Sequence, residues 1–467
     1  MNDGLFLPTG LPTGVSAADG RFPRVLIIGY NFDLLTGGGI TLTNLFREWP
    51  REQLAVAAFH PCEVDPAPCA RQYLLGSDEA HWAWPIGLAI AGSRQPSTPD
   101  LELVMPAESK TAASAAEPPA FGAGAGYRSI AVAGLRWLGG ADVLRSLSCS
   151  HRLREWARDV RPDLIYTQLA SLGMIRLVTQ LADGLSLPIA LHVMDDWPSV
   201  IYDQGLLGPL FRAKTDRSFR TLVARATATL AISQPMADVY HLRYGREWQV
   251  FHNPVDIAKW ATTRRRERSQ RGTFGLVYAG RVGQGIESSL VDVCLAVEEL
   301  KRRGLDLQLD VFTPSRSAAA ALLLTSFDGV HVHDAIEDER MPEALAAADL
   351  LVLPYDFSGK AAEFACLSYP TKAPAYMATG VPVLVYAPRE HALALDARDK
   401  RWAFVVDTPG VEGLITAIRK LASDEVLRET LAERAVATCE SVHDARVVRR
   451  RFRAALARAA GPAGAAT

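Results

Sequence analysis

The stretch RVLIIGYNFDLLTGGGITLTNLFREWP, residues 24–50, indicates the fold class most clearly. It opens with the apolar run Val25–Ile28, passes through a glycine-rich loop, and continues with the spacing of an amphipathic helix. The stretch TFGLVYAGRVGQGIESSLVDVCLAVEELKRRG, residues 273–304, repeats this order. Continuous apolar strands that alternate with helices indicate parallel sheets covered on both faces. The sequence therefore predicts two doubly wound α/β halves, which begin near residues 22 and 273.

Further apolar runs extend both halves. They lie at 163–168, 188–194 and 228–233 in the first half, and at 307–313, 330–335, 348–355, 381–387 and 403–407 in the second. We assign 22–255 to the first domain, 256–272 to an arginine-rich linker and 273–441 to the second domain. A helix at 442–460 follows, and we expect 1–21 and 461–467 to be flexible ends.

Two segments leave alternatives open. Residues 92–127 are rich in Ala, Pro, Ser and Gly, a composition that buries too little apolar surface to offset the entropy of ordering. We predict a mobile insertion there, with a substrate lid as the alternative. The helix at 442–460 is basic and amphipathic. We expect it to pack on the domains, and the alternative is that it lies on an anionic membrane.

Composition excludes several classes of protein. Of the 467 residues 49% are hydrophobic, and the formal net charge of −2 lacks the basic excess of a nucleic-acid-binding protein. The six cysteines form no CxxC pair and are expected to be free thiols. Neither a signal peptide nor an apolar run of the roughly 18–20 residues that span a bilayer is evident. We therefore expect a cytoplasmic protein, with peripheral membrane contact as an alternative; no pattern indicates an oligomeric state.

In the first half, two loops carry candidate site residues. The run Gly37, Gly38, Gly39 lets backbone N–H groups approach a ligand at a helix start, although a tight turn explains it equally well. The stretch ALHVMDDWPS places His192, Asp195 and Asp196 at a strand end. Adjacent carboxylates there suit binding of sugar hydroxyls or proton removal. The alternative is that one aspartate caps the next helix.

The second half offers two cations on different loops. Arg281 follows a strand among glycines, in YAGRVGQG, and can fork onto phosphate oxygens; a surface salt bridge is the alternative. Lys372, in YPTKAP, lies at a helix start, where an anion is favoured. Together they predict a diphosphate site. His331 and His333 alternate along a strand without a third ligand, so we interpret them as a polar rim and expect no metal.

Six motifs in order resemble the GT-B glycosyltransferases, specifically the large retaining family 4. They are MDDWP, ISQPMADVYHLRYG, FHNPVD, YAGR, ADLLVLPY and YPTKAPAYMATGVPVLVY, and the resemblance covers about residues 22–440 apart from 92–127. It implies two Rossmann-like domains facing across a cleft, with the acceptor mainly on the first and a nucleotide-sugar on the second. A final helix that crosses back to the first domain is also implied. The implied activity is hexosyl transfer with retention, in cell-surface polysaccharide or glycoconjugate biosynthesis.

The resemblance also implies roles for single residues. Arg281 and Lys372 match the basic pair that clamps the donor diphosphate, so that no metal is required. Gly280 and Thr371 flank this pair, while Gly38 and Gly39 match a loop near the phosphates or acceptor. His192, Asp195 and Asp196 match the region that contacts the transferred sugar or acceptor, with Asp196 as the candidate base.

One position departs from the family pattern. Two glutamates separated by seven residues are usual, and Leu367 and Ala375 occupy their places. The second glutamate typically holds the ribose, and its loss removes a charged hydrogen bond worth about 1.5–3 kcal/mol. Glu363 or Glu390 could replace it. The alternative function is a non-catalytic GT-B protein that binds glycans or a partner. A related epimerase or phosphorylase is a third interpretation, but no pyridoxal-binding lysine site can be located.

Overall fold

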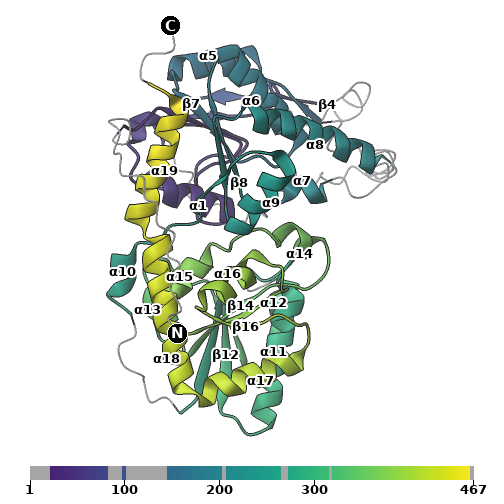
Figure 1. The fold of residues 1–467 in the computed structure, drawn as a ribbon, viewed down its shortest axis with the longest axis vertical. Coiled ribbons are helices and arrows are strands. Elements are labelled where there is room, and N and C mark those ends of the chain that lie inside the picture. The colour runs from purple at the N-terminus through teal and green to yellow at the C-terminus, as the bar shows by residue number, and fades with distance from the viewer. Residues whose placement is uncertain are drawn as a thin grey trace, which may run out of the picture.

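The computed structural model describes residues 21–82, 97–100, 145–201, 207–264, 272–314 and 318–462. They form two α/β domains stacked along the long axis of the molecule (Figure 1). The two-domain, doubly wound architecture expected from the sequence is confirmed. Most of the predicted insertion 92–127, the tail from 463 and residues 1–20 lie outside the described residues.

The N-terminal domain is built on an eight-stranded sheet in the order β10-β9-β8-β7-β1-β2-β3-β5. Its strands are β1 (Val25–Ile28), β2 (Leu54–Ala58), β3 (Arg71–Leu74), β5 (Thr98–Pro99), β7 (Leu164–Thr167), β8 (Ile189–Val193), β9 (Ala228–Ala231) and β10 (Gln249–Val250). All neighbours are parallel except β5, which pairs antiparallel with β3. Residues 97–100 of the predicted insertion thus add to the sheet edge.

Helices cover both faces of this sheet. They are α1 (Gly37–Phe46), α5 (His151–Val160), α6 (Leu172–Leu185), α7 (Trp197–Val200), α8 (Gly208–Arg225) and α9 (Gln234–Tyr244), with a small β4 (Ala80–Trp82) and β6 (Arg145–Leu147) ribbon beside them. Hydroxyl side chains that accept a hydrogen bond from the backbone begin four of the helices: Thr36, Ser150, Ser171 and Ser233. The helix starts are therefore fixed by local chemistry.

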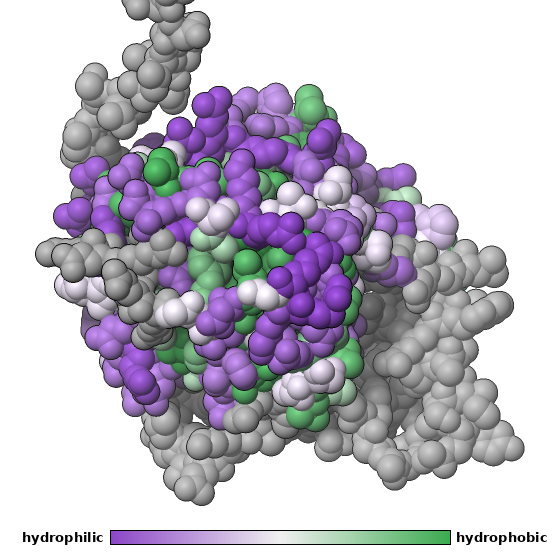
Figure 2. All heavy atoms as spheres, turned by 90° about the horizontal axis from the view of Figure 1, so that it is seen from below, coloured by the Kyte–Doolittle hydropathy of each residue, from purple (hydrophilic) through white to green (hydrophobic). Residues whose placement is uncertain are grey.

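The C-terminal domain has a six-stranded parallel sheet in the order β13-β12-β11-β14-β15-β16. Its strands are β11 (Phe274–Ala279), β12 (Leu307–Thr313), β13 (Val330–Asp334), β14 (Leu350–Pro354), β15 (Val383–Tyr386) and β16 (Phe404–Val406). The helices are α11 (Glu287–Arg302), α12 (Ala319–Leu324), α13 (Met341–Ala346), α14 (Lys360–Ala365), α15 (Lys372–Ala378), α16 (Ala392–Lys400), α17 (Val411–Ser423) and α18 (Glu425–Thr438). Hydrophilic side chains predominate on the end of the molecule that this domain forms (Figure 2).

The strand order identifies where a ligand would bind. The chain builds β1, β2 and β3 outward in one direction and then returns to add β7, β8 and β9 on the other side. In the second domain, β11, β12 and β13 go one way, and β14, β15 and β16 the other. Ligands of such sheets bind beyond the carboxyl ends of the strands where the order reverses. The loops after β1, β7, β11 and β14 are therefore the expected ligand-binding loops.

The chain crosses between the domains twice. The predicted linker contains a short helix, α10 (Ile257–Ala261), and the backbone N–H of Val255 donates to His443 O at 2.9 Å. After this crossing, α19 (Ala445–Ala460) runs along the N-terminal domain (Figure 1). Its Phe452 is fully buried, with ring centroids 5.1 Å from Phe46 and 5.4 Å from Phe251. Burial of such a side chain stabilises the docked helix by about 1.5–3 kcal/mol. The final helix thus packs on the first domain.

Candidate functional site

Lys372 begins α15, and its ammonium group lies at the end of β11. Its Nζ donates a 2.9 Å hydrogen bond to the Tyr278 hydroxyl and lies 4.2 Å from the centroid of that ring. Tyr278 in turn donates to the backbone carbonyl of Arg281 at 2.6 Å. The lysine is thus held by a neutral phenol and a π face, which orient its charge without cancelling it.

Gly280 makes room for this lysine. Its φ is +154°, and a Cβ at this position would lie 2.1 Å from Lys372 Nζ. Any side chain here would displace the ammonium group. The glycine that the sequence places between Tyr278 and Arg281 is therefore required by the close approach of Lys372.

Arg281 and Lys372 converge, as the sequence predicted. Burial, and then the positive charge of Arg281, lower the pKa of Lys372 to about 7. Arg281 is exposed, and no ion pair or side-chain hydrogen bond within the described ranges engages its guanidinium. No carboxylate among the described residues pairs with either cation. Two like charges held together favour a bound anion, because the anion relieves their repulsion.

The helix that carries Lys372 is fixed to the same strand end one turn later. The hydroxyl of Tyr376 accepts a 2.8 Å hydrogen bond from the backbone N–H of Ala279. Both side chains project from one face of α15, because residues four apart on a helix lie above one another. This second attachment fixes the position of α15 relative to β11.

The N-terminal domain holds the turn that precedes Lys372. Ser368 Oγ donates to Asp195 Oδ1 at 2.5 Å, and Ser233 Oγ donates to Leu367 O at 2.6 Å. Asn253 Nδ2 donates to Thr371 O at 3.0 Å, while its Oδ1 accepts from Asn44 on α1. The first domain therefore contacts the residues around the cationic helix start.

Of the two aspartates, Asp195 faces the second domain. Burial raises its pKa, although the hydrogen bond from Ser368 lowers it. Burial raises the pKa of Tyr30 to about 12, and the negative charge of Asp195 contributes to this rise. The same charge contributes to the raised pKa of Tyr355. Asp195 is thus grouped with tyrosines from both domains at the carboxyl ends of the strands.

Asp196 has a different position from the one expected of a catalytic base. Its Oδ1 accepts hydrogen bonds from the Tyr240 hydroxyl at 2.9 Å and from Arg243 Nη1 at 2.8 Å. Arg243 Nη2 approaches the other oxygen at 3.3 Å. Asp196 is buried, and this ion pair ties the start of α7 to α9. Its carboxylate is occupied within the first domain, which corrects the assignment of Asp196 as a base.

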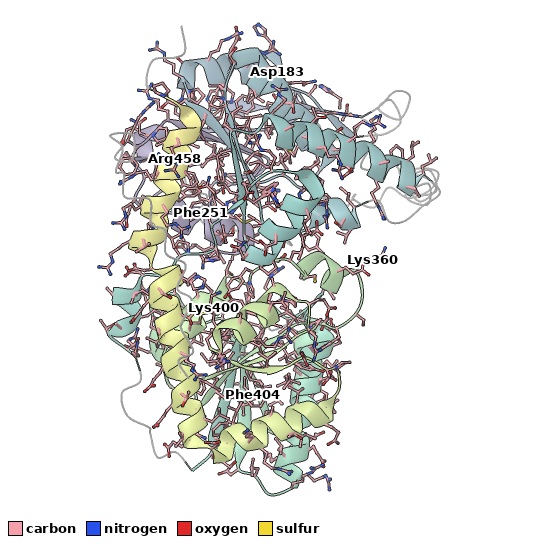
Figure 3. All side chains as sticks on the ribbon, in the orientation of Figure 1. Asp183, Phe251, Lys360, Lys400, Phe404 and Arg458 are labelled. Carbon is pink, nitrogen blue, oxygen red and sulfur yellow. The ribbon has the colours of Figure 1, made fainter. Side chains whose placement is uncertain are left out.

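His192 is part of the core rather than the site. It is fully buried on β8, with Nδ1 2.7 Å from the Tyr166 hydroxyl and Nε2 3.1 Å from Phe251 O. Phe251 lies in the N-terminal domain beside α19 (Figure 3). Burial lowers the pKa of His192 to about 3, so the ring stays neutral. The sequence prediction failed because side chains alternate along a strand, and His192 points to the face that α19 covers.

The glycine loop is shaped by the protein's own side chains. A Cβ at Gly39 would lie 2.0 Å from Asp33 Oδ2, and one at Gly38 would lie 2.8 Å from Tyr30 Cε1. Asp33 Oδ1 also accepts hydrogen bonds from the backbone N–H groups of Leu35 and Thr36. Gly38 and Gly39 therefore admit Tyr30 and Asp33, and their position near the phosphates or acceptor stays a prediction.

Ala375 lies in the first turn of the lysine-bearing helix and is partly exposed. The two glutamates considered as replacements, Glu363 on α14 and Glu390 before α16, are both exposed. Within the described part of the chain, neither makes a side-chain hydrogen bond or ion pair with α15, so their role as replacements stays a prediction.

Sequence reasoning missed Tyr355 and His391. Tyr355 directly follows β14, and its ring centroid is 4.6 Å from that of His391, the N-cap of α16. Both belong to loops at the carboxyl ends of strands. That topological signal could have found them, because β14 begins the second half of the sheet order.

Other expectations concern metals, thiols and membranes. Within the described ranges, no cluster of three or more His, Cys, Asp or Glu could hold a metal. His333 Nε2 instead lies 2.7 Å from Asp310 Oδ1, which accepts its hydrogen bond, and the ring stacks on Phe312. All six cysteines are free, as expected. No helix in the described part of the chain combines the length and apolarity that a membrane span needs.

Two sequence families match the chain. The family described as Glycosyltransferase Family 4 matches residues 101–259, and the one described as Glycosyl transferases group 1 matches residues 273–424. No curated protein sequence matches the chain. The first match ends within the linker helix α10, and the second lies in the second domain.

Solved structures share the fold at low sequence identity. Sucrose-phosphate synthase from Thermosynechococcus elongatus is 13% identical, with a TM-score of 0.58 over 92% of this chain and 96% of that chain. HepE from Anabaena, in complex with UDP-glucose, is 13% identical, with a TM-score of 0.57 over 93% and 100%. An α,α-trehalose 6-phosphate synthase from Burkholderia multivorans is 11% identical, with a TM-score of 0.56 over 94% and 99%. At these identities the likeness shows the fold, two facing Rossmann-like domains.

Proposed function

Because the chain belongs to the family 4-like glycosyltransferases of the GT-B fold, we propose that it transfers a hexose from a nucleoside-diphosphate sugar. The acceptor is a glycan, lipid or small molecule, and the pathway is polysaccharide or glycoconjugate biosynthesis. The observation that carries the proposal is the convergence of Arg281 and Lys372 without a carboxylate partner among the described residues.

The two cations would act on the leaving group. A diphosphate that departs from the sugar gains negative charge, and positioned cations stabilise this charge most strongly where water is excluded. Lys372 is half-buried and oriented by Tyr278, so little reorganisation is needed when the charge develops. This arrangement supports transfer without a metal ion, which stays a proposal.

Among the described residues, neither Asp196 nor His192 is a free base at the strand ends of the first domain. Asp196 is bound by Tyr240 and Arg243, and His192 is buried in the core. A mechanism in which the leaving phosphate accepts the proton of the incoming hydroxyl needs no dedicated base. Such a same-face reaction leads to retention at the anomeric carbon, and we include retention in the proposal. Asp195, which faces the second domain, is the candidate for orienting the acceptor or sugar.

Solved structures that share the fold support a nucleotide-sugar as the donor. HepE was crystallised with UDP-glucose and with UDP. This is a property of that protein, so UDP-sugars are one group of a panel that also contains GDP- and ADP-sugars. Titration of the parent protein with the panel, followed by calorimetry, identifies the donor base. Lys372→Ala is expected to weaken the response, and no response to any nucleotide by the parent contradicts the proposal.

A second candidate function is favoured by Ala375, whose methyl group cannot accept a hydrogen bond from a ribose hydroxyl. In this alternative the protein binds a glycan or a partner without turnover. Ala375→Glu distinguishes the two, because restoring the carboxylate should strengthen nucleotide binding by roughly tenfold to a hundredfold if the nucleoside lies beside α15. Unchanged affinity, together with no release of nucleoside diphosphate from any sugar nucleotide, favours the binding protein.

A further inference from the structure

Tyr355 lies at the carboxyl edge of the second sheet, where Arg281 and the ammonium group of Lys372 also lie. It follows β14 at the reversal of the strand order, and its ring is half-buried. Burial raises its pKa most, Tyr376 and Asp195 raise it further, and Arg281 lowers it. The phenol is therefore within electrostatic reach of a carboxylate of the first domain and a guanidinium of the second. No hydrogen bond among the described residues uses its hydroxyl.

His391 packs on Tyr355 and leaves a donor unused. The ring centroids are 4.6 Å apart at an interplanar angle of 35°. Nδ1 accepts a 3.2 Å hydrogen bond from the backbone N–H of Leu393, so in the neutral ring the proton is on Nε2. His391 is 2% exposed, and its Nε2 has no partner among the described residues. Burial lowers the pKa of His391 to about 4, which keeps the ring neutral.

Buried donors are nearly always paired, so an unused one beside a candidate site marks a place for a ligand atom. The charges of the neighbouring side chains indicate which kind of ligand atom this donor would bind. Arg281 and Lys372 suit the diphosphate, and a sugar attached to it extends beyond the phosphates. Tyr355 and His391 are neutral hydrogen-bonding groups, which suit hydroxyls better than phosphate oxygens. Leu367 stands where a family glutamate would offer a carboxylate, so other groups must recognise the sugar if it is bound.

We propose that the Tyr355 hydroxyl and the Nε2–H of His391 bind hydroxyl groups of the transferred sugar and thereby set donor-sugar specificity. This inference rests on the proposed function, since it assumes that the cations bind the donor diphosphate. The stacked rings give the two groups a fixed spacing.

The test compares two ligands that differ only in the sugar. UDP and UDP-glucose, GDP and GDP-mannose, and ADP and ADP-glucose are titrated into the parent protein by calorimetry, and the pair that binds is kept. Tyr355→Phe removes one hydroxyl and retains the ring stack. His391→Asn removes the Nε2–H and retains a side chain that caps α16 well. His151→Asn, on α5 at the far end of the first domain (Figure 1), is the control.

Each site variant is expected to weaken binding of the sugar nucleotide by about tenfold while the affinity for the free nucleoside diphosphate stays within twofold. His151→Asn should change neither. Equal losses for both ligands, or no loss for either, overturn the sugar assignment and leave the diphosphate assignment standing. Failure of the parent protein to bind any nucleotide instead contradicts the proposed function. If His391→Asn does not fold by thermal melting, Tyr355→Phe alone decides the result.

Discussion

Ser368 of the second domain donates a 2.5 Å hydrogen bond to Asp195 of the first. This bond joins the DDWP loop to the turn that leads into the lysine-bearing helix. Because the acceptor is a carboxylate, the bond is of the charge-assisted kind. Domain arrangement and the geometry of the cationic site are thus connected through one pair of side chains.

Ser368→Ala should loosen the arrangement of the two domains. A hydrogen bond to a charged group contributes about 1.5–3 kcal/mol, and its loss favours a more open arrangement. Small-angle X-ray scattering should then give a larger radius of gyration for the variant. Ser423→Ala, which removes an exposed serine on α17 that bonds only to its own helix, is the control. Identical scattering from both variants would show that the Asp195–Ser368 bond does not hold the domains.

Gly280→Ala should displace the ammonium group of Lys372 although the lysine itself is retained. The new Cβ would occupy the position of Nζ, so nucleotide binding should fall to the level of Lys372→Ala. Gly283→Ala is a matched control, because its φ of +152° gives similar backbone strain while no atom lies within 4 Å of the added Cβ. In calorimetry, the double variant Gly280→Ala/Lys372→Ala should bind no worse than Lys372→Ala alone. Additive losses would mean that the two residues act independently.

Binding of a nucleoside diphosphate should depend on pH. The pKa of Lys372 is lowered to about 7 by burial and Arg281, and a bound anion favours the charged form and raises that pKa. The free protein therefore loses the proton as pH rises through 7, while the complex retains it. Affinity should fall above pH 7, and binding at pH 8 should take up close to one proton. Calorimetry in two buffers of different ionisation enthalpy measures this uptake, and Lys372→Ala should abolish it.

The protein should lose stability in mild acid because two buried histidines lie at the crossing between the domains. His252 and His443 lie with ring centroids 4.3 Å apart, and both Nδ1 atoms are buried without partners among the described residues. Burial lowers the pKa of His252 to about 4 and that of His443 well below 6.5. The unfolded chain therefore binds more protons than the folded protein below pH 6.5. Stability present above that pH should decline as pH falls toward 4, by up to about 1.4 kcal/mol per pH unit for each histidine.

His252→Phe tests this explanation. Phenylalanine keeps a ring in the stack with His443 and Tyr369 but cannot be protonated. The difference in Tm between pH 7.5 and pH 5 should be smaller for the variant than for the parent protein. His241→Phe, at an exposed histidine on α9, should leave that difference unchanged. An undiminished difference in His252→Phe would place the acid sensitivity at another group.

Apolar runs were sufficient to predict the two sheets, because strands such as β1 and β14 are buried at every residue and read as unbroken hydrophobic segments. The convergence of Arg281 and Lys372 also followed from their positions after a strand and at a helix start. The sequence could not show which face His192 points to, since this depends on α19, more than 250 residues later. Nor could it show that Arg243 engages Asp196, or that Tyr30 and Asp33 lie over the glycines, because these are tertiary contacts.

The most direct test of the central claim is calorimetric titration of the parent protein and Arg281→Ala with a nucleoside diphosphate and with the matching nucleoside. If the two cations bind the diphosphate, Arg281→Ala should weaken binding of the diphosphate by roughly tenfold to a hundredfold and leave binding of the nucleoside unchanged. Equal losses for both ligands, or no loss for the diphosphate, would contradict the account.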